Sequence, residues 1–319
     1  MTTTPDRTPA NIPARTVLTF RTPEDVLAAV PVLLGFEPSE SVVMLTFGGQ
    51  ETFHARVDLP PPRELDDAVD LLVEPAVAHG VTQVLLVVYS RRQRLAERLL
   101  VRWGQAFAAV GIGMVMSLRV DGRSWFLPGR PGVPYDIGAH PFLVRSVLEG
   151  NVVARSREEL AARLEPTPGV AAVEEARTAV PAYDATEVAV TVWRALEHGR
   201  FEDAELAGVL QGLRDGAVRD AAWASMTRDD AAAHVALWTD AVQRSPGDLV
   251  GGPASVLGLA AWLAGNGALA WCAVDRCVES DPDNSLAGLV GDLLSRAVPP
   301  SSWERSWPRH ALPDADEPG

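Results

Sequence analysis

The sequence predicts an α/β protein of α+β character: an N-terminal α/β sandwich built on a mixed sheet, followed by an all-helical C-terminal domain. Three observations predict it. Helix and strand patterns alternate up to residue 127, and two hairpins interrupt the alternation. Residues 81–89 form an almost continuous apolar run, which is typical of a strand buried on both faces. From Asp184 onward, strand patterns are absent.

The first elements follow from local signals. Residues 1–14 carry prolines at 5, 9 and 13, and we expect a disordered leader there. A short apolar strand is expected at 17–20. A helix then begins with Thr22 as its N-cap and Pro23 in its first position, and it ends near residue 34.

The rest of this half contains two hairpins. Gly48-Gly49 connects the first pair of strands, and Asp121-Gly122 connects the second. The expected strands lie at 41–47, 52–59, 81–89, 112–120 and 123–127, with helices at 65–79 and 91–110 and a loop at 128–136.

Composition divides the chain into two domains. Residues 166–183 mix Pro, Gly, Glu and Ala and predict a flexible linker. The predicted organisation is a leader at 1–14, an α/β domain at 15–165, the linker at 166–183, a helical domain at 184–303 and an acidic tail at 304–319. The remaining helices are expected at 140–149, 156–164, 184–198, 202–214, 215–226, 228–244, 253–264, 267–280 and 284–296.

Residues 254–282 partly match the tetratricopeptide pattern, in which small residues recur through two helices. Gly258, Gly265 and Ala270 occupy small-residue offsets, and Pro282 ends the second helix. Two interpretations remain: a tetratricopeptide-like helical pair that offers a groove to a partner, or an ordinary helical bundle with small-residue contacts.

Charge and composition exclude several classes of function. All 28 cationic side chains are arginine, so Schiff-base catalysis and a P-loop lysine are excluded. A net charge of −14 disfavours binding to nucleic acid, which depends on neutralising phosphates. The densest basic segment is predicted to be the solvated face of a helix, and it contains Arg91, Arg92, Arg94, Arg98 and Arg102.

No metal or cofactor is expected. Cys272 and Cys277 lie five residues apart on a predicted helix and point to different faces, which favours small core residues over a redox pair. The six histidines lack zinc-ligand spacing, and no dinucleotide fingerprint follows a strand. Because no signal peptide or membrane-spanning run is evident, we expect a soluble, cytoplasmic protein.

Polar residues at strand ends form the candidate site. Ligands of open α/β sheets bind beyond the carboxyl ends of strands. Arg56, Asp58 and Tyr89 therefore predict a ligand pocket, and Asp121 and Arg123 flank the second hairpin turn. The alternative is structural: Arg56 and Asp58 form an ion pair, and Asp121 serves only the turn.

A second charged cluster lies in the helical half. Arg219 and Asp220 stand amid apolar neighbours, and an interhelical ion pair is the favoured interpretation.

Several segments together carry a resemblance to a family. Residues 22–31 read Thr-Pro-Glu-Asp-Val-Leu-Ala-Ala-Val-Pro, and residues 33–43 read Leu-Leu-Gly-Phe-Glu-Pro-Ser-Glu-Ser-Val-Val. With further stretches they resemble the actinobacterial family named only as domain of unknown function 4192, over residues 17–300. The further stretches are 55–60, 87–89, 120–123, 156–160, 219–223 and 260–270.

This resemblance implies a family but no activity. Similar members often carry a Cys-Cys-Pro stretch shortly after the Asp-Gly-Arg hairpin. Residues 126–134 contain no cysteine, so the resemblance supports no thiol or metal role for that loop here.

The leading functional hypothesis is a non-enzymatic ligand- or partner-binding, regulatory protein, with a protein partner docking on the helical domain. The alternative is an enzyme that acts on a small anionic substrate, clamped by arginine, at an unfamiliar site on the strand ends. Nucleic-acid binding is a third and disfavoured hypothesis, and no membrane association is expected. The sequence does not determine the oligomeric state.

Overall fold

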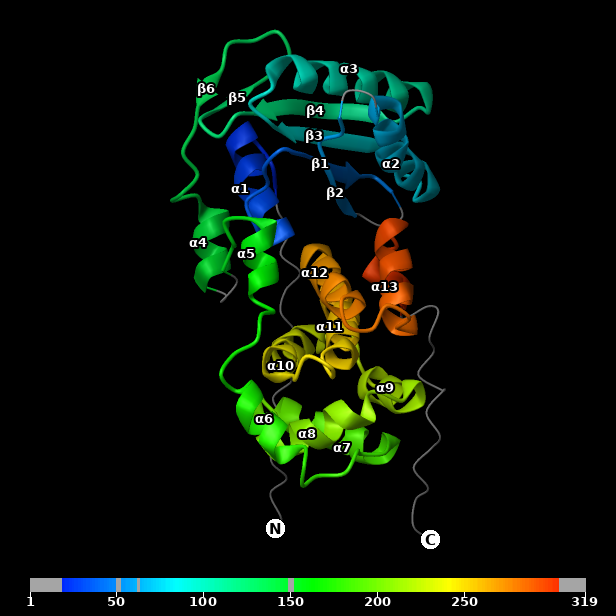
Figure 1. Cartoon of the computed structure of the whole chain (residues 1–319). Coiled ribbons are helices and arrows are strands. Elements are labelled where there is room, and N and C mark those ends of the chain that lie inside the picture. The colour runs from blue at the N-terminus through cyan, green and yellow to red at the C-terminus, as the bar shows by residue number, and fades with distance from the viewer. Residues whose placement is uncertain (1–18, 50–52, 62–63, 149–151, 304–319) are drawn as a thin grey trace, which may run out of the picture.

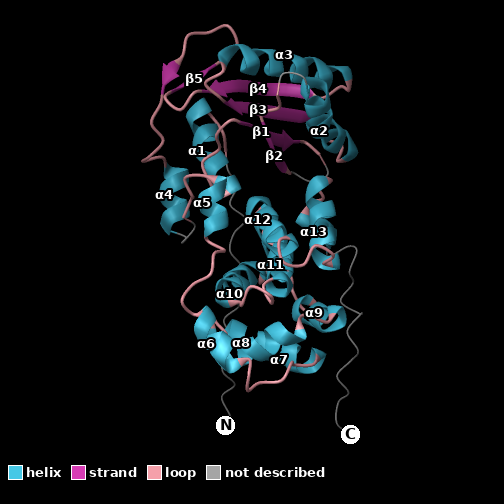
Figure 2. Cartoon of the chain, in the orientation of Figure 1, coloured by secondary structure: helices cyan, strands magenta, loops and turns pink. Residues whose placement is uncertain are grey.

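The computed structural model describes residues 19–49, 53–61, 64–148 and 152–303. The strands gather at one end of the molecule and most of the later helices at the other (Figures 1 and 2). This arrangement confirms the predicted α+β fold class. The leader predicted at 1–14 and the acidic tail predicted at 304–319 lie outside the described residues.

Six strands form one mixed sheet in the order β2-β1-β3-β4-β5-β6. Only the β3–β4 pair is parallel within the described sheet, and the four other pairs are antiparallel. Both predicted hairpins are present, as the β1–β2 and β4–β5 pairs. The strands are β1 (Ser41–Phe47), β2 (His54–Asp58), β3 (Gln83–Tyr89), β4 (Gly113–Val120), β5 (Ser124–Phe126) and β6 (Val133–Pro134).

Helices cover both faces of the sheet. Val84, Leu86 and Val88 of β3 pack with α2 and α3, whereas Leu85 and Val87 pack with α1 on the opposite face. All five side chains are buried, as the apolar run at 81–89 predicts. The three helices are α1 (Pro23–Leu34), α2 (Leu65–Ala78) and α3 (Gln93–Ala109).

Helix α1 begins and ends where its sequence predicts. The Thr22 hydroxyl accepts a hydrogen bond from the backbone N–H of Asp25, and the Asp25 carboxylate accepts one from Thr22. Gly35 ends the helix with φ of 77°, a conformation that favours glycine.

The expected strand at 17–20 is wrong for the two of its residues that the structure describes. Residues 19 and 20 have no strand conformation. The Phe20 ring instead packs edge-on against Phe47, with centroids 6.3 Å apart. Its apolar character serves packing on the sheet rather than strand pairing. The expected loop at 128–136 also contains the short strand β6.

The expected linker at 166–183 contains a packed helix, α6 (Val170–Ala176), so it is not simply a flexible connector. Val173 is fully buried, and the backbone N–H of Thr167 donates to the Gln243 carbonyl. Pro168 and Gly169 precede α6, so the residues that suggested a linker in fact lead into a helix.

The described residues after Asp184 form helices and no strand, as predicted. Almost every residue of α11 is buried, which is typical of a helix at the centre of a bundle. The elements from α4 onward are α4 (Pro141–Leu148), α5 (Arg157–Ala162), α7 (Ala185–His198), α8 (Asp203–Gly212), α9 (Gly216–Trp223), α10 (Ala231–Arg244), α11 (Gly251–Leu263), α12 (Gly267–Val278), α13 (Ser285–Ser295) and the short 3-10 helix η2 (Pro300–Ser302).

One continuous apolar core joins the α1 face of the sheet to the helical region. It contains Leu45 and Leu85 from the sheet as well as Trp238 and Leu257 from α10 and α11. The predicted division into an α/β domain and a helical domain is not decided by this shared core, and it stays a prediction.

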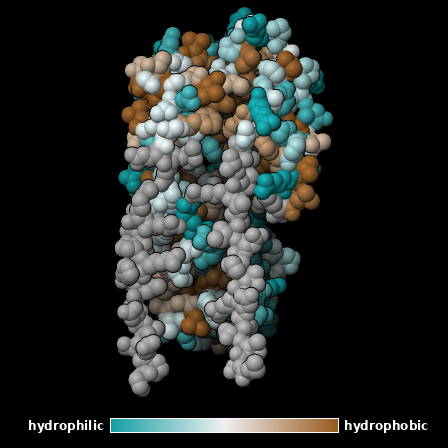
Figure 3. Space-filling view, turned by 180° about the vertical axis from the view of Figure 1, so that it is seen from behind, coloured by the Kyte–Doolittle hydropathy of each residue, from teal (hydrophilic) through white to brown (hydrophobic). Residues whose placement is uncertain are grey.

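On the outside, hydrophilic and hydrophobic residues are interspersed over the sheet-containing end (Figure 3). Among the described helices, none combines the length and apolarity that a bilayer-spanning segment requires.

Candidate functional site

A cavity of about 480 Å³ lies where β3 and β4 end. Its walls come from α1, the α1–β1 loop, the β3–α3 loop, the β4–β5 turn and the segment after β6. The volume falls within the range of roughly 300–1,000 Å³ that is typical of small-molecule sites. The cavity is therefore the strongest candidate for a functional site in the described part of the chain.

The sheet topology places the cavity. β3 and β4 are parallel, so their carboxyl ends meet at one edge. β1 runs antiparallel to β3, and Ser41 at its start pairs with Tyr89 at the end of β3. The loop that enters β1 is thereby brought to the same edge. This is the edge at which open α/β sheets bind ligands.

Tyr89 lines the cavity, and its hydroxyl oxygen is buried and has no hydrogen-bond partner among the described residues. Burial raises the pKa of Tyr89 well above its usual value, and the neighbouring Tyr135 phenol raises it further. The hydroxyl therefore stays protonated at neutral pH and can donate to a ligand. Buried polar groups are nearly always paired, so an unpaired one in a cavity wall needs an explanation.

Asp121 lies in the β4–β5 turn, directly after Val120, which pairs with Tyr89. Burial alone raises the pKa of the Asp121 carboxyl, but the backbone N–H groups of Ser124 and Arg123, each 2.9 Å from its Oδ1, lower it. The charges of Arg119 and Arg91 lower this pKa further, to a net value below the usual one. Arg91 also donates from its Nε to the Asp121 carbonyl, 3.4 Å away. The Asp121 carboxylate is thus compensated by protein groups.

Glu40 is held at the start of α3. Its carboxylate accepts a hydrogen bond from the Ser90 hydroxyl at 3.0 Å and pairs with the Arg92 guanidinium at 2.7 Å. Ser90 Oγ in turn accepts from the backbone N–H of Arg92. Glu40 has φ of 40°, which is uncommon for a residue other than glycine. The protein's own carboxylate therefore occupies the position near the α3 N-terminus that attracts anions.

Glu37 differs from these two carboxylates. It lines the cavity, it is exposed, and within the described residues it forms no ion pair. Burial raises the pKa of Tyr135, and the charges of Asp121 and Glu37 raise it further, so both carboxylates lie near that phenol. Glu37 supplies a negative charge that no arginine of the described ranges pairs with.

The cavity brings together two of the five candidate residues, Tyr89 and Asp121. Arg56, Asp58 and Arg123 do not line it. Arg56 Nη2 pairs with Asp58 Oδ1 at 2.7 Å on β2, as the structural alternative predicts. Ser41 of β1 pairs with Asp58 of β2 on one side and with Tyr89 of β3 on the other. Two strand spacings, roughly 10 Å, therefore separate Asp58 from Tyr89.

Arg123 serves the hairpin turn through its backbone. Its N–H donates to Asp121, and its carbonyl accepts from the backbone N–H of Tyr135. The side chain is exposed, and Arg123 is absent from the cavity wall. The sequence prediction missed Glu37, Ser90 and Tyr135. The only sequence signal for Glu37 is its place in a loop that enters a strand, and that signal requires the strand pairing.

The other predicted polar features are structural. Cys272 and Cys277 are buried and free, and burial raises the pKa of the Cys277 thiol to about 12. In α3, Arg94, Arg98 and Arg102 lie on the exposed face, as predicted. No group of three or more His, Cys, Asp or Glu side chains that could hold a metal was found in the described ranges.

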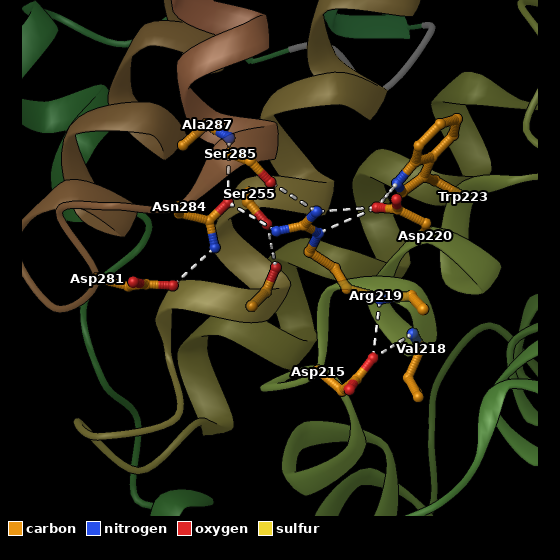
Figure 4. A network of polar contacts seen from close by, with 12 residues as sticks. Asp215, Val218, Arg219, Asp220, Trp223, Ser255, Asp281, Asn284, Ser285 and Ala287 are labelled. Carbon is orange, nitrogen blue, oxygen red and sulfur yellow. Dashed lines mark hydrogen bonds and ion pairs between the residues drawn. The ribbon is translucent and has the colours of Figure 1, made fainter.

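Arg219 lies at the centre of a buried polar network (Figure 4). It pairs with Asp220 of the same helix at 2.9 Å, so the predicted interhelical ion pair is in fact an intrahelical one. The interhelical link consists of hydrogen bonds from its guanidinium to Ser285 Oγ and Asn284 Oδ1, at the start of α13. This network joins α9 to α13.

Residues 23–301 match the model of a protein family described as a domain of unknown function, DUF4192. The chain belongs to this family. The match covers the sheet, the cavity and the helical region together. Comparisons with curated proteins and with solved structures found no match.

Proposed function

We propose that this protein is a non-enzymatic binding protein whose cavity at the carboxyl ends of β3 and β4 holds a small molecule. The observation that carries the proposal is the unpaired, buried hydroxyl of Tyr89 in the wall of a cavity of about 480 Å³. A ligand with a hydrogen-bond acceptor would satisfy this hydroxyl, and burying it unpaired costs about 1–3 kcal/mol.

The lining supports binding rather than catalysis. A catalytic serine needs a neighbouring base, and the buried Ser90 hydroxyl does lie beside the Glu40 carboxylate. However, Ser90 Oγ also accepts a hydrogen bond from the backbone N–H of Arg92. Glu40, the base that would activate it, is neutralised by the Arg92 guanidinium. Both groups are therefore engaged in holding the start of α3.

A Ser39→Trp variant tests the proposal. Ser39 is an exposed residue of the cavity wall, so an indole there fills space without disturbing the core. A fragment library screened by thermal shift against the wild type should yield stabilising compounds, because a ligand that binds only the folded state raises its stability. The same compounds should leave the melting temperature of Ser39→Trp unchanged.

The matched control is Ser295→Trp, which adds an indole to an exposed position at the end of α13. It should respond to the compounds as the wild type does. If the library yields no binder, or if the binders stabilise Ser39→Trp equally, the cavity is not a binding site and the proposal is wrong.

The second candidate is an enzyme that acts on a small anionic substrate at the same edge. The observation that favours it is the 3.0 Å hydrogen bond between Ser90 and Glu40, next to Arg91 in the cavity wall. Mass spectrometry of each bound compound after prolonged incubation distinguishes the candidates. Chemical conversion that disappears in Ser90→Ala would favour the enzyme, and unchanged compounds would favour the binding protein.

A protein partner for the helical domain stays a prediction. The large apolar side chains most open to such contact include Trp193, which is 63% exposed on α7, and Val190 about one turn before it.

A further inference from the structure

The charges around the cavity decide what kind of molecule it would hold. Four charged side chains line it: Glu37, Glu40, Asp121 and Arg91. Their partners show which of these charges remain available to a ligand, because a carboxylate already paired with an arginine gains little from a second cation.

Two of the three carboxylates are compensated. Glu40 pairs with Arg92 at 2.7 Å. Asp121 receives two backbone N–H groups, and the guanidinium groups of Arg91 and Arg119 lie close enough to favour its charged form. Glu37 has no ion-pair partner in the described part of the chain, so one negative charge in the wall is left over.

The neighbours of Glu37 suit a cation. Burial raises the pKa of the Tyr135 phenol, and the charge of Glu37 contributes to raising it further. Tyr135 likewise adds to the effect of burial on the pKa of Tyr89, so the carboxylate and the two phenols lie near one another. Aromatic faces attract ammonium and guanidinium groups, and a carboxylate adds a charge-assisted hydrogen bond. The rest of the wall includes apolar side chains, among them Leu27 and Ile137.

An anion in the cavity would be repelled by its carboxylates. The amino end of α3 is the local feature that attracts negative charge, but Ser90 Oγ already accepts from its backbone and Glu40 lies beside it. An anionic ligand would find Arg91 in the wall, but the charge of Arg91 already favours the ionised form of Asp121, and the ligand would also approach Glu37. The lining therefore favours a cation over the small anionic substrate of the alternative, enzymatic hypothesis.

We infer that the ligand is a small organic monocation, an ammonium or guanidinium group on an apolar body, with its charge at Glu37 and a hydrogen-bond acceptor at the Tyr89 hydroxyl. This inference rests on the proposed function, since it names the chemistry of the ligand in the same cavity.

The test uses fragments in matched triples, in which one apolar body carries an amine, an alcohol or a carboxylate. 4-Methoxyphenethylamine, 2-(4-methoxyphenyl)ethanol and 3-(4-methoxyphenyl)propanoate form one such triple, and the shared ether oxygen supplies the acceptor for the Tyr89 hydroxyl. Binding to the full chain is measured by thermal shift and by isothermal titration calorimetry. We expect the amines to bind at least about tenfold more tightly than their neutral and anionic counterparts, which is the scale of one hydrogen bond to a charged group.

Glu37→Gln removes the charge and keeps the size of the side chain. It should weaken binding of the amines about tenfold and leave that of the alcohols unchanged. Glu197→Gln makes the same change at an exposed position on α7 and should bind as the wild type does. Circular dichroism of both variants checks that they fold.

The outcomes separate this inference from the proposed function. If carboxylates or alcohols bind best, or if Glu37→Gln binds amines as tightly as the wild type, the inference of a monocationic ligand is wrong. The proposal that the cavity binds a small molecule is then unaffected. If no member of any triple binds while the fragment library yields compounds that Ser39→Trp excludes, this inference fails alone. If the library also yields no binder, or if binding survives in Ser39→Trp, the proposed function fails and this inference fails with it.

Discussion

At the scale of single residues, arginine takes roles for which a lysine would be poorly suited. The Arg219 guanidinium reaches Asp220 on its own helix and Ser285 and Asn284 at the start of α13 (Figure 4). A planar group with five donors can satisfy three acceptors in different directions, which an ammonium group does less well. Asn284 also caps α13 by accepting the backbone N–H of Ala287, so the network fixes where that helix begins.

Arg219→Leu should lower the free energy of unfolding by about 2 kcal/mol, because it removes charge-assisted hydrogen bonds from a side chain that is only 8% exposed. Asp220 is half exposed and is solvated in the variant, so no buried charge is left alone. Urea denaturation measures the change. Arg214→Leu at an exposed position is the control and should change stability by less than about 0.5 kcal/mol.

At the scale of secondary-structure elements, close helix contacts depend on glycines that sequence patterns do not distinguish. Gly212 ends α8, and a Cβ atom there would lie 2.4 Å from the backbone carbonyl oxygen of Tyr183. Gly258 lies in the middle of α11, where a Cβ atom would meet Val274 at 3.5 Å, an ordinary contact distance. Both positions are buried, yet only Gly212 is required by a neighbouring backbone.

Gly212→Ala should therefore destabilise the protein by about 1–3 kcal/mol, the usual cost of overpacking against atoms that cannot move. Gly258→Ala should be neutral or stabilising by up to about 1 kcal/mol, because alanine favours the helix. Thermal unfolding of both variants checks the contrast. Equal destabilisation by the two substitutions would show that the α11–α12 contact also excludes a methyl group.

At the scale of the whole molecule, the sheet end and the helical end share contacts as well as a core. Arg157 on α5 pairs with Asp275 on α12 at 2.7 Å. His79 at the end of α2 lies 3.1 Å, through its Nε2, from the carbonyl oxygen of Arg296 after α13. The apolar core continues from the sheet into α10 and α11.

We therefore expect the protein to unfold in one cooperative transition, although the sequence predicts two domains. Differential scanning calorimetry should show a single peak whose calorimetric and van't Hoff enthalpies agree. Two separable transitions would instead support the boundary at 166–183 and would mean that the shared core is too small to couple the two ends.

Several features follow from the sequence because their causes are local. Thr22, Pro23 and Gly35 define α1 through capping, and the apolar run at 81–89 predicts a strand buried on both faces. Burial of both cysteines likewise agrees with their spacing on a helix. The place of Tyr89 and Asp121 in the cavity wall was predictable, since each ends or follows a strand whose partner runs parallel.

Only the tertiary structure decides the rest of the site. Pairing of β1 with β3 brings the loop that holds Glu37 and Glu40 to the same edge as Ser90, although Glu40 and Ser90 lie 50 residues apart in the chain. Pairing of β1 with β2 places Arg56 and Asp58 two strands from Tyr89, where they form an ion pair with each other. The sequence by itself determines most of the strands and helices, because propensity and capping act over a few residues, although β6 and α6 were not predicted. The order of strands in the sheet depends on contacts between distant segments, and that order decides which charges face the cavity.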